Sequence, residues 1–288
     1  MEPILKPRSP TTAIAEVLGR RTFDSAVLEL TDFTCPYIKR RCTKRSTSNK
    51  TEPYPVCSIW VGKESNGLDR TKSGPICVCP KRFMEVDFLA DVLKNCWKGE
   101  KPTATIIATE VKMAGFGNVD FVIAEQTSDG SVGQFLSVEL QAIDITGTVN
   151  PDYMALRLGG LTAKPKSYGL NWDNVYKRYI TQLIRKGYFH HHWKSKIVAV
   201  IQDQVYQNII ARANFMRTKD VHDPTVNIIF MTYVLEEQPN GQFKPILKAV
   251  EGTSHSSLQQ AALYIEAPLR EDFCKRILQS ANRKGKKL

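Results

Sequence analysis

The chain has 288 residues, of which 42% are hydrophobic, so it can form one large domain or two smaller ones around a buried core. Its 40 Lys and Arg residues against 29 Asp and Glu give a net charge of +11, which favours a polyanionic partner such as nucleic acid. No segment approaches the roughly 20 apolar residues of a membrane span, and the N-terminus lacks the apolar run of a secretory signal. We therefore expect a cytoplasmic protein without a membrane partner.

The first third of the chain carries most of the cysteines. Residues 1–11 predict an extended, proline-containing arm, and residues 12–19 predict a short helix. Polar, loop-like sequence follows and contains five of the seven cysteines, namely Cys35, Cys42, Cys57, Cys77 and Cys79. Thiolates around a Zn²⁺ or iron ion in tetrahedral geometry would constrain such loops. The alternative is a set of separate buried thiols, because the spacing matches no common zinc motif.

A helix and three strands are predicted next. Apolar residues recur at helical spacing over residues 82–97, and segments rich in β-branched and aromatic residues follow at residues 104–112, 118–125 and 134–144. A polar turn separates the last two segments, which indicates a β-hairpin.

Each strand of this hairpin carries a carboxylate inside an apolar run. Asp120 lies in the first strand and Glu139 in the second, with Gln141 two residues further on and on the same face as Glu139. Charges near an apolar core are costly unless a metal or a partner offsets them. Because Mg²⁺ takes only one or two protein carboxylates and keeps several waters, the pair predicts a magnesium site.

The second half of the chain predicts further helices and strands. A helix should begin near residue 171, and a buried strand (197–201) and a second helix (203–216) should follow it. A pair of strands (226–235 and 243–250), two helices within residues 256–282 and a basic tail (283–287) complete the chain. The histidines of residues 190–192 are interpreted as the end of the first of these helices, because successive side chains diverge and cannot share one metal ion. Cys96 and Cys274 lie on apolar helical faces and are interpreted as packing residues.

Basic residues indicate surfaces for nucleic acid. The helix near residue 171 should turn Lys177, Arg178, Arg185 and Lys186 toward solvent or DNA. The loop of residues 147–169, which contains Arg157, Lys164, Lys166 and Tyr168, either contacts phosphates or is an ordinary surface loop. In the cysteine segment, a basic run is expected to help read DNA through Lys39, Arg40, Arg41, Lys44 and Arg45.

The arrangement Asp120…Glu139-Leu-Gln141 resembles the signature of the PD-(D/E)xK nucleases, with Gln141 in place of the usual lysine. Together with the cysteines, it resembles the NotI-type type II restriction endonucleases, in which glutamine occupies that position. The resemblance implies that Glu110, on the preceding strand, matches the upstream acid of such sites. It also implies a structural four-cysteine site, described for the family as binding iron, formed by Cys35, Cys42, Cys57 and Cys79, with Cys77 as a substitute ligand.

This resemblance implies the fold class and the activity. The fold would be α/β, with an arm and four-cysteine segment at residues 1–83 and a PD-(D/E)xK core, a mixed sheet flanked by helices, at residues 84–288. The activity would be Mg²⁺-dependent cleavage of double-stranded DNA at a palindromic site by a homodimer, and a cognate DNA methyltransferase is expected. Asp120 and Glu139 would hold Mg²⁺. Gln141 cannot act as a base, so water activation would fall on the metal and Glu110.

Three other functions fit the same residues. The first is a DNA-binding regulator stabilised by zinc or iron, which would not cut DNA. The second is a repair or Holliday-junction nuclease with the same core, which would prefer branched DNA. The third is an RNA-processing enzyme, which would depend on the 2′-hydroxyl, although the sequence contains no RNA-recognition signature.

Overall fold

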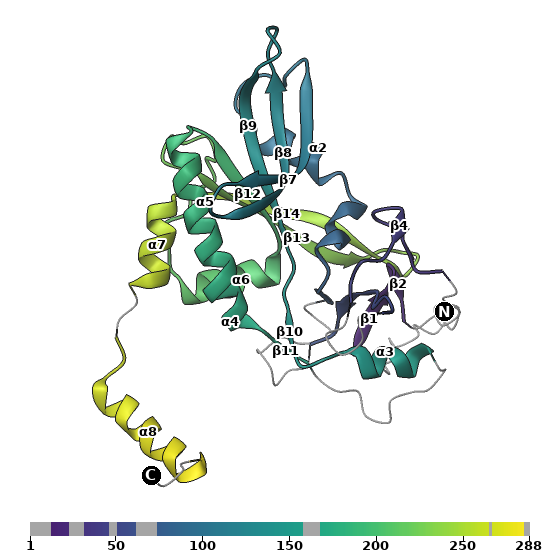
Figure 1. The fold of residues 1–288 in the computed structure, drawn as a ribbon, viewed down its shortest axis with the longest axis vertical. Helices are drawn as coiled ribbons and strands as arrows, with labels where there is room; N and C mark the ends of the chain where they lie inside the picture. Colours follow the sequence, from purple (N-terminus) through teal and green to yellow (C-terminus); the bar gives the residue numbers. More distant parts are fainter. Residues whose placement is uncertain are drawn as a thin grey trace, which may run out of the picture.

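The computed structural model describes residues 13–22, 32–45, 51–61, 74–157, 168–264 and 267–284. A six-stranded mixed sheet organises this part of the chain, in the order β14-β13-β12-β9-β8-β7 (Figure 1). β12 runs parallel to β9 and β13, and the other neighbours are antiparallel. The strands are β7 (Thr105–Met113), β8 (Gly117–Gln126), β9 (Val132–Gln141), β12 (Lys196–Gln202), β13 (Ile228–Glu237) and β14 (Phe243–Thr253).

Helices cover both faces of this sheet. Ile197, Ala199 and Ile201 of β12 pack in one apolar cluster with α5 (Thr181–His192) and α6 (Asp203–Arg212). Val198 and Val200 pack in a second cluster with α2 (Phe88–Cys96) and the 3₁₀ helix η2 (Pro80–Glu85). Successive residues of a strand point to opposite faces, so the apolar run is buried on both sides. The expected mixed α/β fold, with a mixed sheet flanked by helices, is confirmed.

Several local predictions were wrong. Where a helix was expected over residues 12–19, the described residues 13–19 form no helix but the strand β1 (Ile14–Val17), which is buried along its whole length and pairs with β2 (Arg20–Arg21) and β5 (Val56–Ile59). The helix expected over residues 82–97 is divided into η2 and α2, and the Asp87 carboxylate caps α2 by accepting the Ala90 N–H at 2.9 Å. The loop expected after residue 147 contains α3 (Asn150–Arg157).

The remaining elements are short or lie at the C-terminal end. Short strands form β3 (Thr34–Cys35), β4 (Arg40–Arg41), β6 (Ile76–Cys77), β10 (Ile145–Thr146) and β11 (Gly169–Leu170). α4 (Trp172–Asn174) leads through a π-helical segment η3 (Val175–Ile180) into α5, and α7 (His255–Leu263) packs on α5. α8 (Arg270–Lys284) lies away from the sheet (Figure 1). None of the helices in the described ranges is long and apolar enough to cross a membrane.

Some predicted features lie outside the described residues. These are the arm at residues 1–11, Lys164, Lys166 and the end of the basic tail. The division of the chain at residue 83 stays a prediction.

A buried ion pair joins the N-terminal strands to the large sheet. Arg82 and Glu16 are both fully buried, and Arg82 Nη2 donates to Glu16 Oε1 at 3.0 Å and to the main-chain oxygen of Phe243 in β14 at 2.6 Å. The Ser58 hydroxyl in β5 donates to Glu16 Oε2 at 2.6 Å. One guanidinium therefore connects β1, η2 and β14.

His190 fastens α5 to β9. Its ring is fully buried, with Nδ1 2.6 Å from the main-chain oxygen of Lys186 and Nε2 2.7 Å from the hydroxyl of Ser137. A carbonyl oxygen can only accept a hydrogen bond, so Nδ1 carries the proton and Nε2 accepts from Ser137. Burial lowers the pKa of His190 to about 4, and the imidazole is therefore neutral at pH 7.

Replacing Arg82 should destabilise the fold. Arg82→Met leaves the Glu16 carboxylate buried without its cation, so the free energy of unfolding should fall by about 3–5 kcal/mol. Urea unfolding measures the change. Lys275→Ala is the control, because it removes only the exposed ion pair between Lys275 and Asp272, 3.4 Å apart, and should have no measurable effect. Equal midpoints for the two variants would contradict the role of Arg82.

The neutral His190 should make stability depend on pH. In the unfolded chain, histidine takes up its proton near pH 6.5, whereas His190 in the folded protein does so only near pH 4. Between these values the unfolded state binds more protons, so the stabilisation is lost as the pH falls. The difference in unfolding free energy between the wild type and His190→Gln should shrink by about 3 kcal/mol from pH 7 to pH 4. A difference that stays constant in urea titrations would show that folded His190 takes up its proton at the same pH as in the unfolded chain.

Candidate active site

The two carboxylates that the sequence singled out meet where β8 and β9 pair. Phe121 pairs with Val138, so Asp120 and Glu139, the next residues along the two strands, lie across from each other. Asp120 Oδ2 accepts the backbone N–H of Leu140 at 2.8 Å, which fixes this carboxylate on β9. Phe121, Val138 and Leu140 belong to the cluster on the α2 side of the sheet, so Asp120 and Glu139 face α5.

Glu110 joins this pair from the neighbouring strand. β7 and β8 pair on both sides of Glu110, so that it lies across from Asp120. Its φ is 53°, a left-handed conformation that is uncommon for a residue other than glycine. The exposed carboxylate accepts a hydrogen bond from Asn118 Nδ2 at 3.4 Å. Strained residues of this kind cluster at functional sites, and here the strain lies beside the two central carboxylates.

Lys186 enters the site from α5, so the prediction that its side chain faces solvent was wrong, whereas the alternative that it faces DNA stays a prediction. The residue is only 3% exposed, and its ammonium forms an ion pair with Glu139 and donates to the main-chain oxygen of Asn118 at 2.8 Å. One signal was present in the sequence, since Lys186 follows the apolar Leu183 by three residues and so shares its helix face. Helical periodicity could not show that a carboxylate lies opposite that face.

Burial and the neighbouring carboxylates disfavour the charged forms of Asp120 and Glu139, whereas Lys81 and Lys186 favour the charged form of Asp120. Burial raises the pKa of Glu139 to about 7, although the Lys186 ammonium lowers it, and the charges of Asp120 and Glu110 raise it further. Burial also raises the pKa of Asp120, the Leu140 N–H lowers it, and Glu110 adds to the rise. A divalent cation would relieve this crowding. Asp120 and Glu139 therefore fit Mg²⁺, which needs only one or two protein carboxylates.

Gln141 lies at the end of β9, on the same face as Glu139. Its side chain is half-buried, and Nε2 donates to the main-chain oxygen of Ala142. The amide has no net charge, so it adds nothing to the neutralisation of the carboxylates.

Tyr179 is a second site residue that the sequence did not reveal. It lies on η3, and burial raises its pKa well above the usual value, with further contributions from the charges of Glu139 and Asp120. Its buried hydroxyl has no hydrogen-bond partner among the described residues. An unpaired buried hydroxyl is costly and marks a place where a water or a substrate oxygen is needed. Helical periodicity had placed Tyr179 only on an apolar face.

A basic hollow of about 410 Å³ opens beside Lys186. The Arg185 guanidinium lies over the Phe116 ring, 5.3 Å from its centroid, and so ties α5 to the turn between β7 and β8. The walls of this hollow, as far as the structure describes them, hold four basic side chains and no carboxylate, which suits phosphate. They are formed by Gly115, Phe116, Gly117, Lys177, Arg178, Thr181, Gln182, Arg185 and Lys186.

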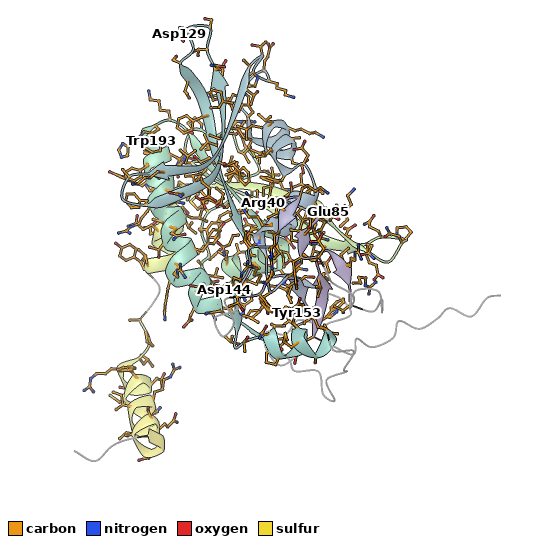
Figure 2. The ribbon with its side chains drawn as sticks, turned by 45° about the vertical axis from the view of Figure 1, so that its right-hand side comes forward. Arg40, Glu85, Asp129, Asp144, Tyr153 and Trp193 are labelled. Atoms are coloured by element: carbon orange, nitrogen blue, oxygen red, sulfur yellow. The ribbon has the colours of Figure 1, made fainter. Side chains whose placement is uncertain are left out.

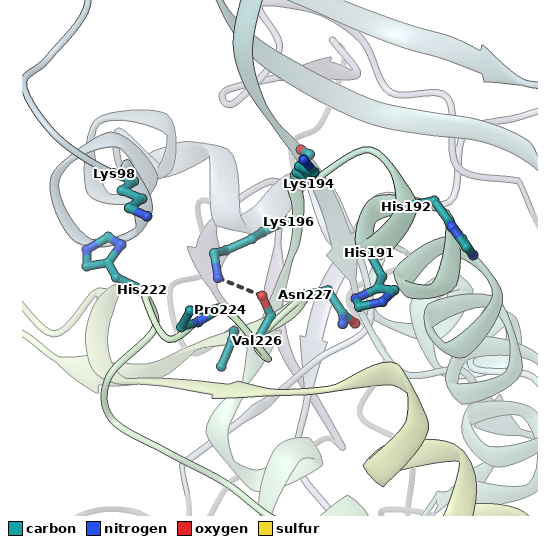
Figure 3. A pocket seen from close by; sticks show the side chains of 10 residues that line it. Lys98, His191, His192, Lys194, Lys196, His222, Pro224, Val226 and Asn227 are labelled. Carbon is teal, nitrogen blue, oxygen red and sulfur yellow. Dashed lines mark hydrogen bonds between the residues drawn. The ribbon is translucent and has the colours of Figure 1, made fainter.

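A second hollow, of about 500 Å³, lies at the other end of α5 (Figure 3). His191 and His192 reach it from the helix, and Lys98 and His222 lie on its opposite side. The Lys196 ammonium at its floor donates to the main-chain oxygen of Val226 at 2.6 Å. α5 ends at His192, as expected. The hollow contains neither Asp120 nor Glu139 and is separate from the carboxylate site.

The basic run of the cysteine segment is only partly available to DNA. Arg40 and Arg41 are exposed in β4, as expected for a DNA contact. Lys44 points inward instead, because its ammonium donates to the main-chain oxygens of Val56 at 2.9 Å and Val78 at 2.8 Å.

The cysteines of the N-terminal segment are mostly buried and influence one another's pKa values in pairs. Burial raises the pKa of Cys42, and the nearby Cys79 and Cys35 raise it further. Burial and then Cys79 raise the pKa of Cys57 well above its usual value. The Cys77 thiol donates to the main-chain oxygen of Cys79 at 3.0 Å, and burial, followed by Cys79, raises its pKa to about 12.

These thiols have the donor chemistry of a zinc or iron site. All seven cysteines are free. Within the described parts of the chain, however, no three His, Cys, Asp or Glu side chains are arranged closely enough to hold a metal ion.

Comparison with known proteins gives one family. Residues 16–244 match the family of the restriction endonuclease NotI. The matched range contains Asp120, Glu139 and Gln141 as well as the cysteines between residues 35 and 79. A search of curated proteins finds no match. Because the family match covers most of the 288 residues, the chain belongs to the NotI restriction endonuclease family.

Proposed function

We propose that this protein is a type II restriction endonuclease that requires Mg²⁺ and hydrolyses double-stranded DNA at a specific, palindromic site. The observation that carries this proposal is the meeting of Asp120 and Glu139 across β8 and β9, in a chain of the NotI family. The same observation supports assigning the six-stranded sheet and α5 to a PD-(D/E)xK core. Such an enzyme acts in the cytoplasm, where a cognate methyltransferase must protect the host's own sites.

The site residues divide the chemistry among them. Asp120, Glu139 and the main-chain carbonyl of Leu140 would hold Mg²⁺, which polarises the scissile phosphate and acidifies water. The oxygen of the attacking water bonds to phosphorus, one ester bond breaks, and the leaving oxygen takes a proton from solvent. Glu110, exposed beside Asp120, would accept the proton of the attacking water. The Gln141 amide can orient that water or a phosphate oxygen.

The basic hollow beside Lys186 is the surface that would receive the DNA backbone. Lys177, Arg178 and Arg185 line it together with Lys186, whose ammonium is paired with Glu139, so that one lysine would separate a phosphate bound there from this carboxylate. The net charge of +11 adds a long-range attraction for DNA.

A homodimer would match the symmetry of a palindrome, since a two-fold enzyme presents the same site to each strand. α8 offers a surface for self-association. Phe273, Ile277 and Leu278 are 61%, 51% and 65% exposed on this helix, and exposed apolar patches mark interaction sites.

The cysteines would hold a structural zinc or iron ion through Cys35, Cys42, Cys57 and Cys79. The mutual influence of Cys42, Cys35 and Cys79 supports this assignment, as does the burial of Cys57 next to Cys79. Cys77 remains the substitute ligand, because its thiol donates to the main-chain oxygen of Cys79 at 3.0 Å, a shorter bond than the 3.7 Å from the Cys57 thiol to the main-chain oxygen of Pro55.

Isosteric changes at the carboxylates should stop cleavage. Asp120→Asn and Glu139→Gln remove the charges that Mg²⁺ needs and should reduce cutting by about 10³-fold or more, while DNA binding in Ca²⁺ persists. The assay incubates long duplex DNA with Mg²⁺ or EDTA and analyses it on a gel. Asp129→Asn is the control, because Asp129 lies at the exposed tip of the β8–β9 hairpin (Figure 2).

The wild-type products separate the possible functions. Discrete bands that require Mg²⁺ are expected, and sequencing of their ends gives the site. A smear would indicate a non-specific or repair nuclease, and intact DNA that still shifts in a binding gel would indicate a regulator. Unchanged cleavage by Asp120→Asn would remove this residue from the active site.

Changes at the metal-site cysteines should remove the bound ion. Cys42→Ser and Cys79→Ser should lose about one zinc or iron per chain and lower the melting temperature, because a thiolate ligand is lost. Elemental analysis by mass spectrometry measures the metal. Cys77→Ser tests the substitute ligand, and Cys274→Ser, on α8, is the control. Purified wild-type protein with neither metal would refute the four-cysteine site.

A further inference from the structure

The motif leaves β9 without a positive charge at the active site. Gln141 occupies the position where the usual motif has lysine, and its amide is neutral. Its Nε2 is already bonded to the main-chain oxygen of Ala142. A phosphate in hydrolysis gains negative charge on its non-bridging oxygens, and positively charged donors aimed at those oxygens supply much of the catalysis. Another residue must therefore provide the cation.

Lys186 meets this requirement. Its ammonium is paired with Glu139 on one side, and the residue lines the basic hollow on the other. It therefore lies between the carboxylate site and the surface suited to phosphate. Arg185, next to it in the chain, lies over the Phe116 ring instead.

The position of Lys186 is fixed by His190, which bonds their shared helix to β9. The His190 Nδ1–H donates to the main-chain oxygen of Lys186, and Nε2 accepts from Ser137, two residues before Glu139 on β9. The helix turn that carries the ammonium is therefore bonded to the strand that carries the carboxylate. A lysine held in this way loses little further freedom when it binds a substrate group.

We propose that Lys186 is the catalytic cation of this enzyme and takes the place of the lysine that Gln141 replaces. Without DNA, its ammonium balances Glu139. When a phosphate fills the hollow, the ammonium donates a hydrogen bond to a non-bridging oxygen of the scissile group. It keeps its proton throughout the exchange of the ester oxygen for a water oxygen. This inference rests on the proposed function, because it requires Asp120 and Glu139 to form the active site.

A purely structural lysine would behave differently. If Lys186 only held Glu139 in place, its removal would weaken metal binding and cleavage together. If it is the catalytic cation, its removal frees Glu139 from a competing positive charge, so that metal binding strengthens while cleavage is lost.

The experiment measures both quantities in Lys186→Gln. The single-turnover rate at saturating DNA and Mg²⁺ should fall by about 10²–10³-fold. Mn²⁺ binding without DNA, measured by calorimetry, should tighten by about threefold or more. The double variant Gln141→Lys with Lys186→Gln returns a cation to the usual position. It should therefore cut at least about tenfold faster than Lys186→Gln alone. Lys94→Gln, on the exposed face of α2, controls for the loss of one positive charge.

Each outcome decides the inference. Cleavage by Lys186→Gln within threefold of wild type would overturn it, as would a parallel loss of cleavage and Mn²⁺ binding. A double variant no faster than Lys186→Gln would also overturn it, because the two positions would not be equivalent. Asp120→Asn is run beside these variants. If Asp120→Asn still cuts, the proposed active site itself fails, whereas failure at Lys186 alone leaves that site in place.

Discussion

The contact between β9 and α5 is the constraint on which the rest of the site depends. β9 turns Ser137, Glu139 and Gln141 toward a helix, and polar groups in such an interface must find partners. His190 satisfies Ser137, and Lys186 satisfies Glu139. These two bonds set how the helix lies on the strand and so place its other basic residues around a hollow next to the carboxylates. Stability and chemistry thus use the same interface.

Hydrogen bonds attach the cysteine segment to the same sheet. The Gln202 side chain, at the end of β12, accepts the Cys77 N–H and donates to the main-chain oxygen of Pro75, both at 2.7 Å. The Ile143 N–H, just beyond β9, donates to the main-chain oxygen of Cys77 at 3.3 Å. With the Arg82–Glu16 pair, these bonds fix the position of the N-terminal strands against the sheet that carries the site.

Local patterns in the sequence predicted the secondary-structure elements better than they predicted the tertiary contacts between those elements. The hairpin with Asp120 and Glu139 was predicted because apolar runs of β-branched and aromatic residues on either side of a polar turn mark two strands, and a charge inside such a run is conspicuous. β1 was missed because a strand buried on both faces lacks alternation and resembles a buried helix. Lys186 and Tyr179 were missed for another reason. Periodicity shows which residues share a helix face but not which strand that face meets, and their roles exist only through Glu139 and Asp120.

The left-handed backbone at Glu110 also affects how readily the edge of the sheet can pair with a strand of another molecule. β7 is the outermost strand of the sheet, and it exposes Ile107 and Val111 on either side of Glu110, by 53% and 37%. A long, regular, apolar edge would invite strands from other molecules to add to it. The turned backbone at Glu110 interrupts that edge in its middle. The residue that we propose as the proton acceptor thereby also makes this edge a poorer template for added strands.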